Sequence, residues 1–263
     1  MSYLADYHVH SEYSDDSVCT MEEMIQTAIQ KQLFEVAFTD HVDYGVKTDL
    51  NCDYEAYFSE IDHLQKKYLG QIVIKKGIEF GVQLHTIEQF KKDINRYPFD
   101  FVILSNHQIE NKEFWNYSYQ KGKTQREYQR DYYQAIYQVM KRYKDYSVLG
   151  HLDMIKRYDE YGDFPDDEIM KYVEPILKLA IKDGKGIEVN TSSFKYGLRD
   201  LMPSKRILKR YCQLGGTIIT VGSDTHETAH LADRIGEVKK ELKVIGFDQF
   251  CTFDQMIPKY HNL

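Results

Sequence analysis

Short apolar runs that end in a potential metal ligand recur along this chain, and they constrain its fold more than any other feature. The first run, Leu4 to Val9, carries His8 and leads directly to His10. Side chains at positions i and i+2 of an extended segment point to one side, so this pair can bind one ion. Later strand-like runs also stop at potential ligands, which are His41, Glu79, His107, His151, the segment Glu188-Val189-Asn190, Asp224 and His226. The sequence therefore predicts an active site at strand ends.

Helical patterns separate these runs. Thr20-Met21-Glu22-Glu23, for example, is a capping-box sequence that opens an amphipathic stretch. The predicted strands are Leu4 to Val9, Val36 to Thr39, Gln71 to Ile78, Phe99 to Leu104, Ser147 to Leu149, Gly186 to Val189 and Thr217 to Val221. Alternating strands and helices favour a parallel sheet. Ligands on nearly every strand favour a closed α/β barrel of seven strands, because an open sheet would concentrate its site at one switch point.

Composition limits the organisation and the partners. The 263 residues contain no linker-like segment, so we expect a single domain, 1–263. A formal net charge of −7 argues against nucleic-acid and membrane partners. The four cysteines are widely spaced and form no Cys-x-x-Cys pair, and no segment reads as a signal peptide or a membrane span. We expect a cytoplasmic protein, and its oligomeric state is left open.

The histidines gather at the predicted strand ends. Six of the 10 histidines lie there, whereas His63, His85, His230 and His261 lie in helical or irregular stretches. A mixed histidine and carboxylate set suits zinc, manganese or iron. The candidate ligands are His8, His10, Asp15, His41, Glu79, His107, His151, Asp224 and His226. They exceed what one ion uses, so we expect two or three divalent metal ions, with Glu79 as a bridge.

The motifs and their order resemble the polymerase and histidinol phosphatase (PHP) family. The resemblance runs through nearly the whole chain, in His8-Val9-His10-Ser11, Ser14-Asp15, Thr39-Asp40-His41, Gly77-Ile78-Glu79, Ser105-Asn106-His107, Gly150-His151 and Gly222-Ser223-Asp224-Thr225-His226. It implies a distorted (β/α)7 barrel with three metals at the C-terminal ends of the strands. The implied ligand sets are His8, His10, Glu79 and Asp224; Glu79, His107 and His151; and Asp15, His41 and His226.

Within the family, the chain looks most like the single-domain histidinol-phosphate phosphatases. This resemblance implies hydrolysis of a small phosphate monoester, L-histidinol phosphate, by a metal-bridging hydroxide. The leaving alkoxide needs a proton, for which water, His226 and Asp40 are the candidates. Asp40 stands where related sequences often carry Glu, and we interpret it as support for His41.

Substrate contacts are less sharply indicated. A dianionic phosphate calls for a cation near the metals, and Arg157 and Arg199 follow the fifth and sixth strands. Glu110, with nearby Trp115 and Tyr117, is a candidate contact for a cationic amine or an imidazole. For each of these residues the alternative interpretation is an ordinary surface position.

Three other functions fit the same residues less well. A phosphoesterase for nucleotide or oligonucleotide ends, or for phosphotyrosine, would use the same metal centre. A metal-dependent amidohydrolase also begins with His-x-His, but it ordinarily has a bridging lysine and an eighth strand. A metal-storing module would have filled coordination shells without an open position.

Overall fold

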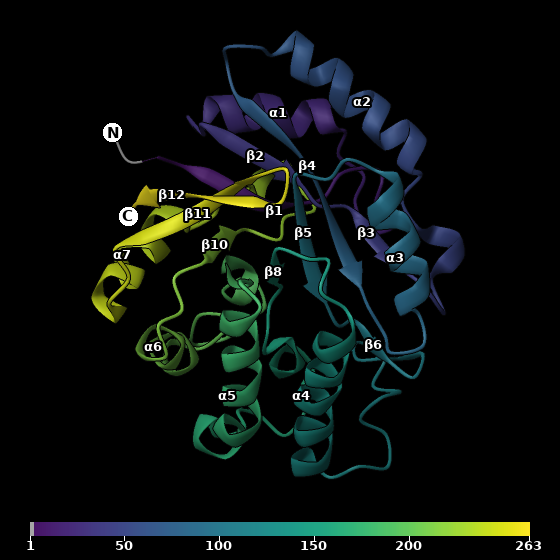
Figure 1. Ribbon diagram of the computed structural model, residues 1–263, viewed down its shortest axis with the longest axis vertical. Coiled ribbons are helices and arrows are strands. Elements are labelled where there is room, and N and C mark those ends of the chain that lie inside the picture. The colour runs from purple at the N-terminus through teal and green to yellow at the C-terminus, as the bar shows by residue number, and fades with distance from the viewer. Residues whose placement is uncertain (1–2) are drawn as a thin grey trace.

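Seven parallel strands follow one another around a nearly closed sheet in the computed structural model, which describes residues 3–263. Figure 1 shows the strands converging near the centre of the molecule. In sheet order they are β1 (Ala5–Val9), β2 (Glu35–Phe38), β4 (Val73–Gly81), β5 (Phe101–Ser105), β8 (Val148–Leu149), β9 (Gly186–Asn190) and β10 (Ile219–Gly222). β3 (His41–Asp43) pairs with the second half of β4, beyond the end of β2. The predicted seven-stranded, distorted barrel is confirmed.

The first and last strands meet where the barrel closes. A parallel bridge joins Val9 to Thr225, and the His10 N–H donates to the Thr225 carbonyl at 2.9 Å. Beside this bridge, the buried Asp6 accepts hydrogen bonds from the Ser223 N–H and hydroxyl and from the Ala232 N–H. A buried carboxylate is costly unless it is hydrogen-bonded. These contacts of Asp6 therefore fix the position of β1 relative to the segment that follows β10.

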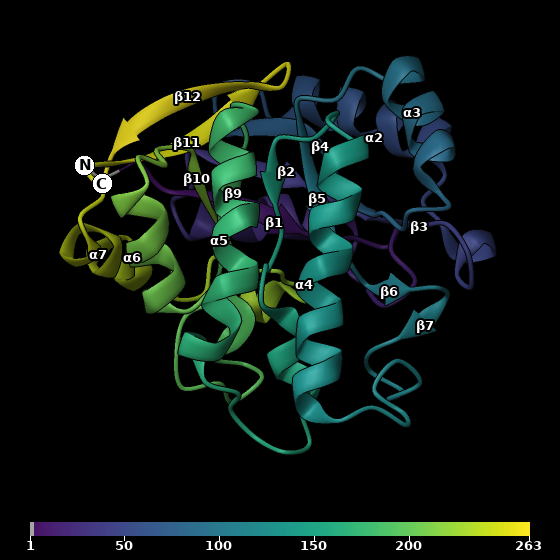
Figure 2. The ribbon, with the colours of Figure 1, turned by 60° about the horizontal axis from the view of Figure 1, so that its bottom comes forward.

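Helices cover the outside of the barrel (Figure 2). They are α1 (Met21–Gln30), α2 (Tyr54–Lys67), α3 (Ile87–Arg96), α4 (Gln125–Arg142), α5 (Asp166–Lys182), α6 (Lys205–Gln213) and α7 (Ile235–Ile245). The predicted capping box at Thr20 and Glu23 is present at the start of α1. No helix within residues 3–263 is long and apolar enough to span a membrane.

Two hairpins were not predicted. One is short, β6 (Gln108–Ile109) with β7 (Lys112–Glu113), and the other is β11 (Gln249–Asp254) with β12 (Ile257–Asn262). The turn of the second hairpin places Gln255 and Met256 at positive φ, and neither is a residue type that signals such a turn.

The β11–β12 hairpin closes the end of the barrel at which the strands begin. The Phe253 N–H donates to the Tyr7 hydroxyl at 2.7 Å, and Lys75 at the start of β4 pairs with Asp254 at 2.6 Å. Phe253 also packs against Phe101, the first residue of β5. Functional side chains must therefore use the opposite end, where the strands finish.

Candidate metal centre

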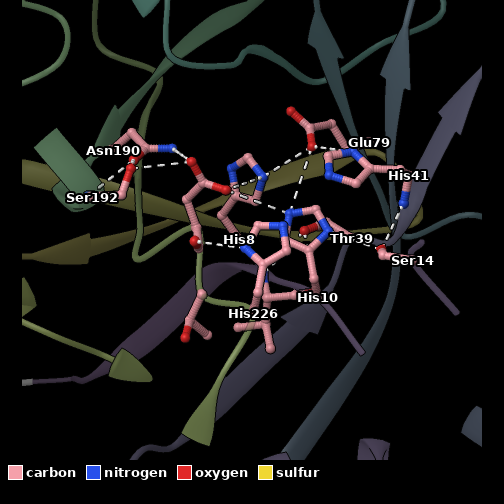
Figure 3. Close-up of polar contacts among 12 residues, drawn as sticks. His8, His10, Ser14, Thr39, His41, Glu79, Asn190, Ser192 and His226 are labelled. Carbon is pink, nitrogen blue, oxygen red and sulfur yellow. Dashed lines mark hydrogen bonds and ion pairs between the residues drawn. The ribbon is translucent and has the colours of Figure 1, made fainter. Parts of the chain in front are cut away.

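Glu79 lies at the middle of the centre, fully buried near the end of β4. Its Oε2 atom faces three histidines, at 3.2 Å from His8 Nε2, 3.6 Å from His10 Nε2 and 2.9 Å from His41 Nδ1 (Figure 3). These histidines come from β1, from the residue after it and from β3. One carboxylate oxygen thus gathers side chains from two separate parts of the barrel.

The other oxygen of Glu79 faces a second group. Oε1 lies 3.2 Å from His107 Nε2 and 2.8 Å from His151 Nε2, and it accepts a hydrogen bond from the Ser105 hydroxyl at 2.5 Å. Glu79, His107 and His151 form one of the groups whose ligand atoms all lie within 4.8 Å of one another. A carboxylate placed between two such groups can bridge two ions.

Asp224 completes the group around His8 and His10. Its Oδ1 atom lies 3.5 Å from His8 Nε2 and 3.5 Å from His10 Nε2. A tetrahedral site with metal–ligand bonds of about 2.1 Å has ligand–ligand edges of about 3.4 Å. The distances from His8 and His10 to Glu79 and to Asp224, 3.2 to 3.6 Å, are close to these edges.

His41 and His226 flank His10 and form a third group with it. The His226 ring stacks on His10, with centroids 4.1 Å apart and an interplanar angle of 13°. The sequence predicts Asp15 as the carboxylate of this group, but the structure turns Asp15 toward Lys47, at 2.8 Å. The neighbouring Asp16 lies 3.3 Å from His226 Nε2 and 3.7 Å from His41 Nε2. Asp16 therefore takes the place predicted for Asp15.

Several ligand atoms in this centre have no hydrogen-bond partner among residues 3–263, although they are buried. They are His8 Nε2, His10 Nε2, His41 Nδ1, Glu79 Oε2 and His226 Nε2. Buried polar atoms are rarely left without a partner, and these five are nitrogen and oxygen atoms that face one another. The donor set and its geometry fit divalent first-row metal ions.

Carboxylates outside the groups orient two of the histidines. His8 Nδ1 donates to Glu188 Oε1 at 2.5 Å, which leaves Nε2 free to bind a metal. His107 Nδ1 donates in the same way to Asp43, at 3.0 Å. Gly81 lies against Asp43 and His107, and a Cβ there would clash with both. These roles of Glu188 and Asp43 were not predicted. The available signal was their place on a strand, two residues from Asn190 and His41 respectively.

Asp40 orients the neighbouring histidines through serines. It is fully buried and accepts hydrogen bonds from the hydroxyls of Ser11 and Ser14. Because the Ser14 proton is used on Asp40, His10 Nδ1 and the His41 N–H donate to Ser14 Oγ, each at 3.1 Å. The predicted supporting role of Asp40 fits this arrangement. Its predicted role as a proton donor does not, because Asp40 does not border the cavity described next.

A cavity of about 290 Å³ opens over the centre and is bordered by His41, His107, His151, Asp224 and His226. Arg157 lies in its wall with only 4% of its side chain exposed. Its Nη2 donates to Asp224 Oδ2 at 2.8 Å and to the Ser192 hydroxyl at 2.6 Å. The wall also includes three aromatic side chains and a lysine, namely Trp115, Tyr158, Tyr196 and Lys47. The cavity therefore combines a buried cation with the histidine centre.

Two predicted substrate contacts lie elsewhere. Arg199 is exposed and borders a different hollow, together with Lys156, Pro165 and Arg206. Glu110 is exposed, at positive φ in the turn between β6 and β7, and does not border the cavity. Both follow strands in the sequence as predicted, but their loops carry them away from the centre.

Charge in the centre keeps its carboxylates ionised. Burial acts to raise the pKa of Glu79, but the surrounding histidines, led by His8, His107 and His41, hold it well below the ordinary value. Burial likewise opposes ionisation of Asp224, whereas His8 and Arg157 hold its pKa well below the usual range. Both side chains are therefore anionic and suited to bind cations.

Replacing Asp43 tests the orientation of His107. Asp43→Asn is expected to weaken metal affinity about 10- to 100-fold, because the amide no longer supplies a charged acceptor for His107 Nδ1. Metal titration of the metal-free protein measures the effect. Asp62→Asn, at a half-exposed carboxylate paired with Lys76, is the matched control and is expected to bind metal like the wild type. Equal affinities for the two variants would remove Asp43 from the centre.

The fold and the site together define a class of protein: parallel β/α barrels with a carboxylate-centred group of histidines at the C-terminal ends of their strands. The sequence profile of the PHP domain matches residues 6–192. The chain belongs to the PHP domain family.

Several proteins similar to this chain are named as histidinol-phosphatases. The chain is 33% identical to a histidinol-phosphatase of Lactococcus lactis over 95% of this chain and 94% of the relative. It is 31% identical to a probable histidinol-phosphatase of Clostridium acetobutylicum, over 84% and 86% of the two chains. A crystal structure of histidinol phosphate phosphatase from Lactococcus lactis, complexed with Zn, L-histidinol and phosphate, superposes with a TM-score of 0.88 at 31% identity, over 98% of this chain and 100% of the other.

Proposed function

We propose that this protein is a metal-dependent phosphatase that hydrolyses L-histidinol phosphate to L-histidinol and inorganic phosphate. The observation that carries the proposal is the set of five histidine nitrogens around one carboxylate, Glu79, beside a cavity with a buried arginine. The similarity to the Lactococcus lactis protein supports the substrate.

Two or three divalent metal ions are part of this proposal. One would be held by His8, His10, Glu79 and Asp224, a second by Glu79, His107 and His151, and a third by His41 and His226 with Asp16. When bound, such ions supply positive charge for the phosphoryl oxygens and lower the pKa of water to about 7. Zinc is the metal named for the solved relative.

Arg157 is the residue that we assign to the phosphoryl group. It is the arginine of the cavity wall, and its guanidinium is fixed by Asp224, by Ser192 and by the Tyr196 ring 4.3 Å away. A planar, immobilised guanidinium binds phosphate oxygens through two parallel hydrogen bonds. Water, His226 and Asp40 are the predicted proton donors for the leaving group. Of the two side chains, His226 borders the cavity and Asp40 does not, so we retain His226 and water.

The alcohol part of the substrate would lie against the aromatic wall. Trp115, Tyr158 and Tyr196 border the cavity and offer ring faces to an imidazole or an ammonium group. We also propose that residues 1–263 act as one unit, because β1 and the segment after β10 supply the same ligand group. The proposed location is the cytoplasm, where the four free cysteines would stay reduced.

Phosphate release from L-histidinol phosphate tests the proposal directly. The zinc- or manganese-loaded protein is expected to reach a kcat/KM of about 10⁴ M⁻¹s⁻¹ or more, with p-nitrophenyl phosphate and a nucleotide bisphosphate far behind. Slow and similar hydrolysis of all three would leave a phosphatase centre but refute the assigned substrate. Absence of phosphate release from every ester would refute the phosphatase as well.

A further inference from the structure

The segment that carries Arg157 is the short 3-10 helix η2 (Met154–Tyr158), which follows β8 and His151. Four residues of this stretch border the cavity, namely His151, Met154, Arg157 and Tyr158. A short helix at the end of a two-residue strand has few backbone hydrogen bonds to hold it. Its position must therefore be fixed by side chains.

Lys156 supplies one attachment, on the side of η2 away from the cavity. Its ammonium lies 2.8 Å from Asp153 Oδ2 and 2.8 Å from Asp166 Oδ1, the latter on the first residue of α5. Ser204, which caps α6, ties the two carboxylates together, since its N–H donates to Asp153 and its hydroxyl donates to Asp166. The lysine thus joins η2 to the start of α5, and Asp153 joins η2 to the start of α6.

Asp153 is buried in this junction, and Lys156 and Asp166 are largely buried, with 20% of the Asp166 side chain exposed. Asp153 has 1% of its side chain exposed, and Lys156 has 15%. Burial acts to lower the pKa of Lys156, but Asp153 and Asp166 raise it above the ordinary lysine value. A buried pair is weak evidence for stability as such, because desolvation offsets much of its attraction, but it fixes geometry.

Asp159 supplies a second attachment, at the residue after η2. Its carboxylate accepts hydrogen bonds from the Tyr128 hydroxyl at 2.5 Å and the Gln129 amide at 2.8 Å, both on α4. Lys156 and Asp159 therefore hold η2 on either side of Arg157. The guanidinium itself is held at its far end by Asp224, Ser192 and Asn190 and by the Tyr196 ring.

We infer that Lys156, held by Asp153 and Asp166, is a positioning residue that presents Arg157 to the phosphoryl group of the substrate. The inference rests on the role proposed above for Arg157. Displacing a catalytic or binding side chain by about 1 Å can lower the rate by up to about 10²-fold. A residue outside the cavity that fixes the position of Arg157 can therefore affect how tightly the site binds phosphate. Loss of the ammonium would remove the ion pair between η2 and the first residue of α5 and let the arginine move.

A double-mutant cycle on phosphate binding tests the inference. The affinity of inorganic phosphate for the metal-loaded protein is measured by calorimetry, with metal content and melting temperature recorded for each variant. Lys156→Met is expected to weaken phosphate binding about tenfold with the metal retained. In an Arg157→Gln background, the same change is expected to have no further effect, because it acts through the arginine. Lys178→Met, which breaks an exposed ion pair with Glu174 on α5, is the control and is expected to bind phosphate like the wild type.

The outcomes separate positioning from general stability. Wild-type phosphate affinity in Lys156→Met, or equal losses in both backgrounds, overturns the inference even if the melting temperature falls. Should Lys156→Met fail to fold, Asp166→Asn is measured in the same cycle, and wild-type affinity there overturns the inference. Unchanged affinity in Arg157→Gln also overturns it. Failure to hydrolyse L-histidinol phosphate would instead count against the proposed function, because phosphate binding does not depend on that substrate.

Discussion

Replacing Glu79 by glutamine is expected to lower kcat for phosphate release by about 10³-fold or more and to remove metal from the protein. Glutamine has nearly the same shape and can still accept the hydrogen bond from Ser105. It lacks the negative charge that His8, His41 and His107 face at 2.9 to 3.2 Å. Because both oxygens of Glu79 serve separate ligand groups, one substitution disturbs two metal positions at once.

Steady-state kinetics and metal analysis of the purified variant measure this effect. Glu60→Gln is the matched control, since Glu60 lies on α2 and accepts a hydrogen bond from the Tyr13 hydroxyl. The control is expected to retain activity and metal content. A Glu79→Gln protein with full metal content and wild-type turnover would show that the carboxylate does not organise the centre.

Removing Arg157 is expected to produce the second largest effect. Arg157→Ala should lower kcat/KM for phosphate esters by about 10²- to 10³-fold, the range found when a preorganised donor to a developing anion is lost. Metal content should stay near that of the wild type, because Asp224 loses a neighbouring cation but the centre loses no ligand. Arg157→Lys should recover only part of the loss, since an ammonium does not reproduce the planar fork of a guanidinium.

Kinetics with L-histidinol phosphate and with p-nitrophenyl phosphate measure the loss, which should appear with both esters. Arg96→Ala provides the control, because Arg96 is an exposed partner of Glu55 at the end of α3. If Arg157→Ala lost its metal, or kept wild-type kcat/KM, the arginine would have to be removed from the phosphate site.

Local patterns account for the parts of the fold that the sequence predicts. The capping box at Thr20 and the alternation of apolar runs with helical periodicity depend only on neighbouring residues. The β11–β12 hairpin escaped prediction because its turn uses Gln255 and Met256 at positive φ, which common turn signals do not include. Its place over the start of the barrel depends on contacts with Tyr7 and Phe101, far away in the sequence.

The sequence likewise predicts some residues of the candidate site and not others. Strand-end positions predict that His8, His10, Glu79 and His107 lie near one another, because parallel strands all finish at one end of the barrel. The sequence does not distinguish Asp15 from Asp16, since the two are adjacent in an irregular loop. The tertiary structure pairs Asp15 with Lys47 and turns Asp16 toward the histidines.

The sequence by itself determined the alternating barrel and the strand ends that supply the ligand groups, because periodicity and strand direction are local properties of the chain. Only the tertiary structure decided that Arg157 and not Arg199 borders the cavity, that Asp40 works from beneath the centre, and that Glu188 orients His8. These relations join residues up to 180 positions apart. They arise from how loops close and side chains pack, which spacing along a chain does not record.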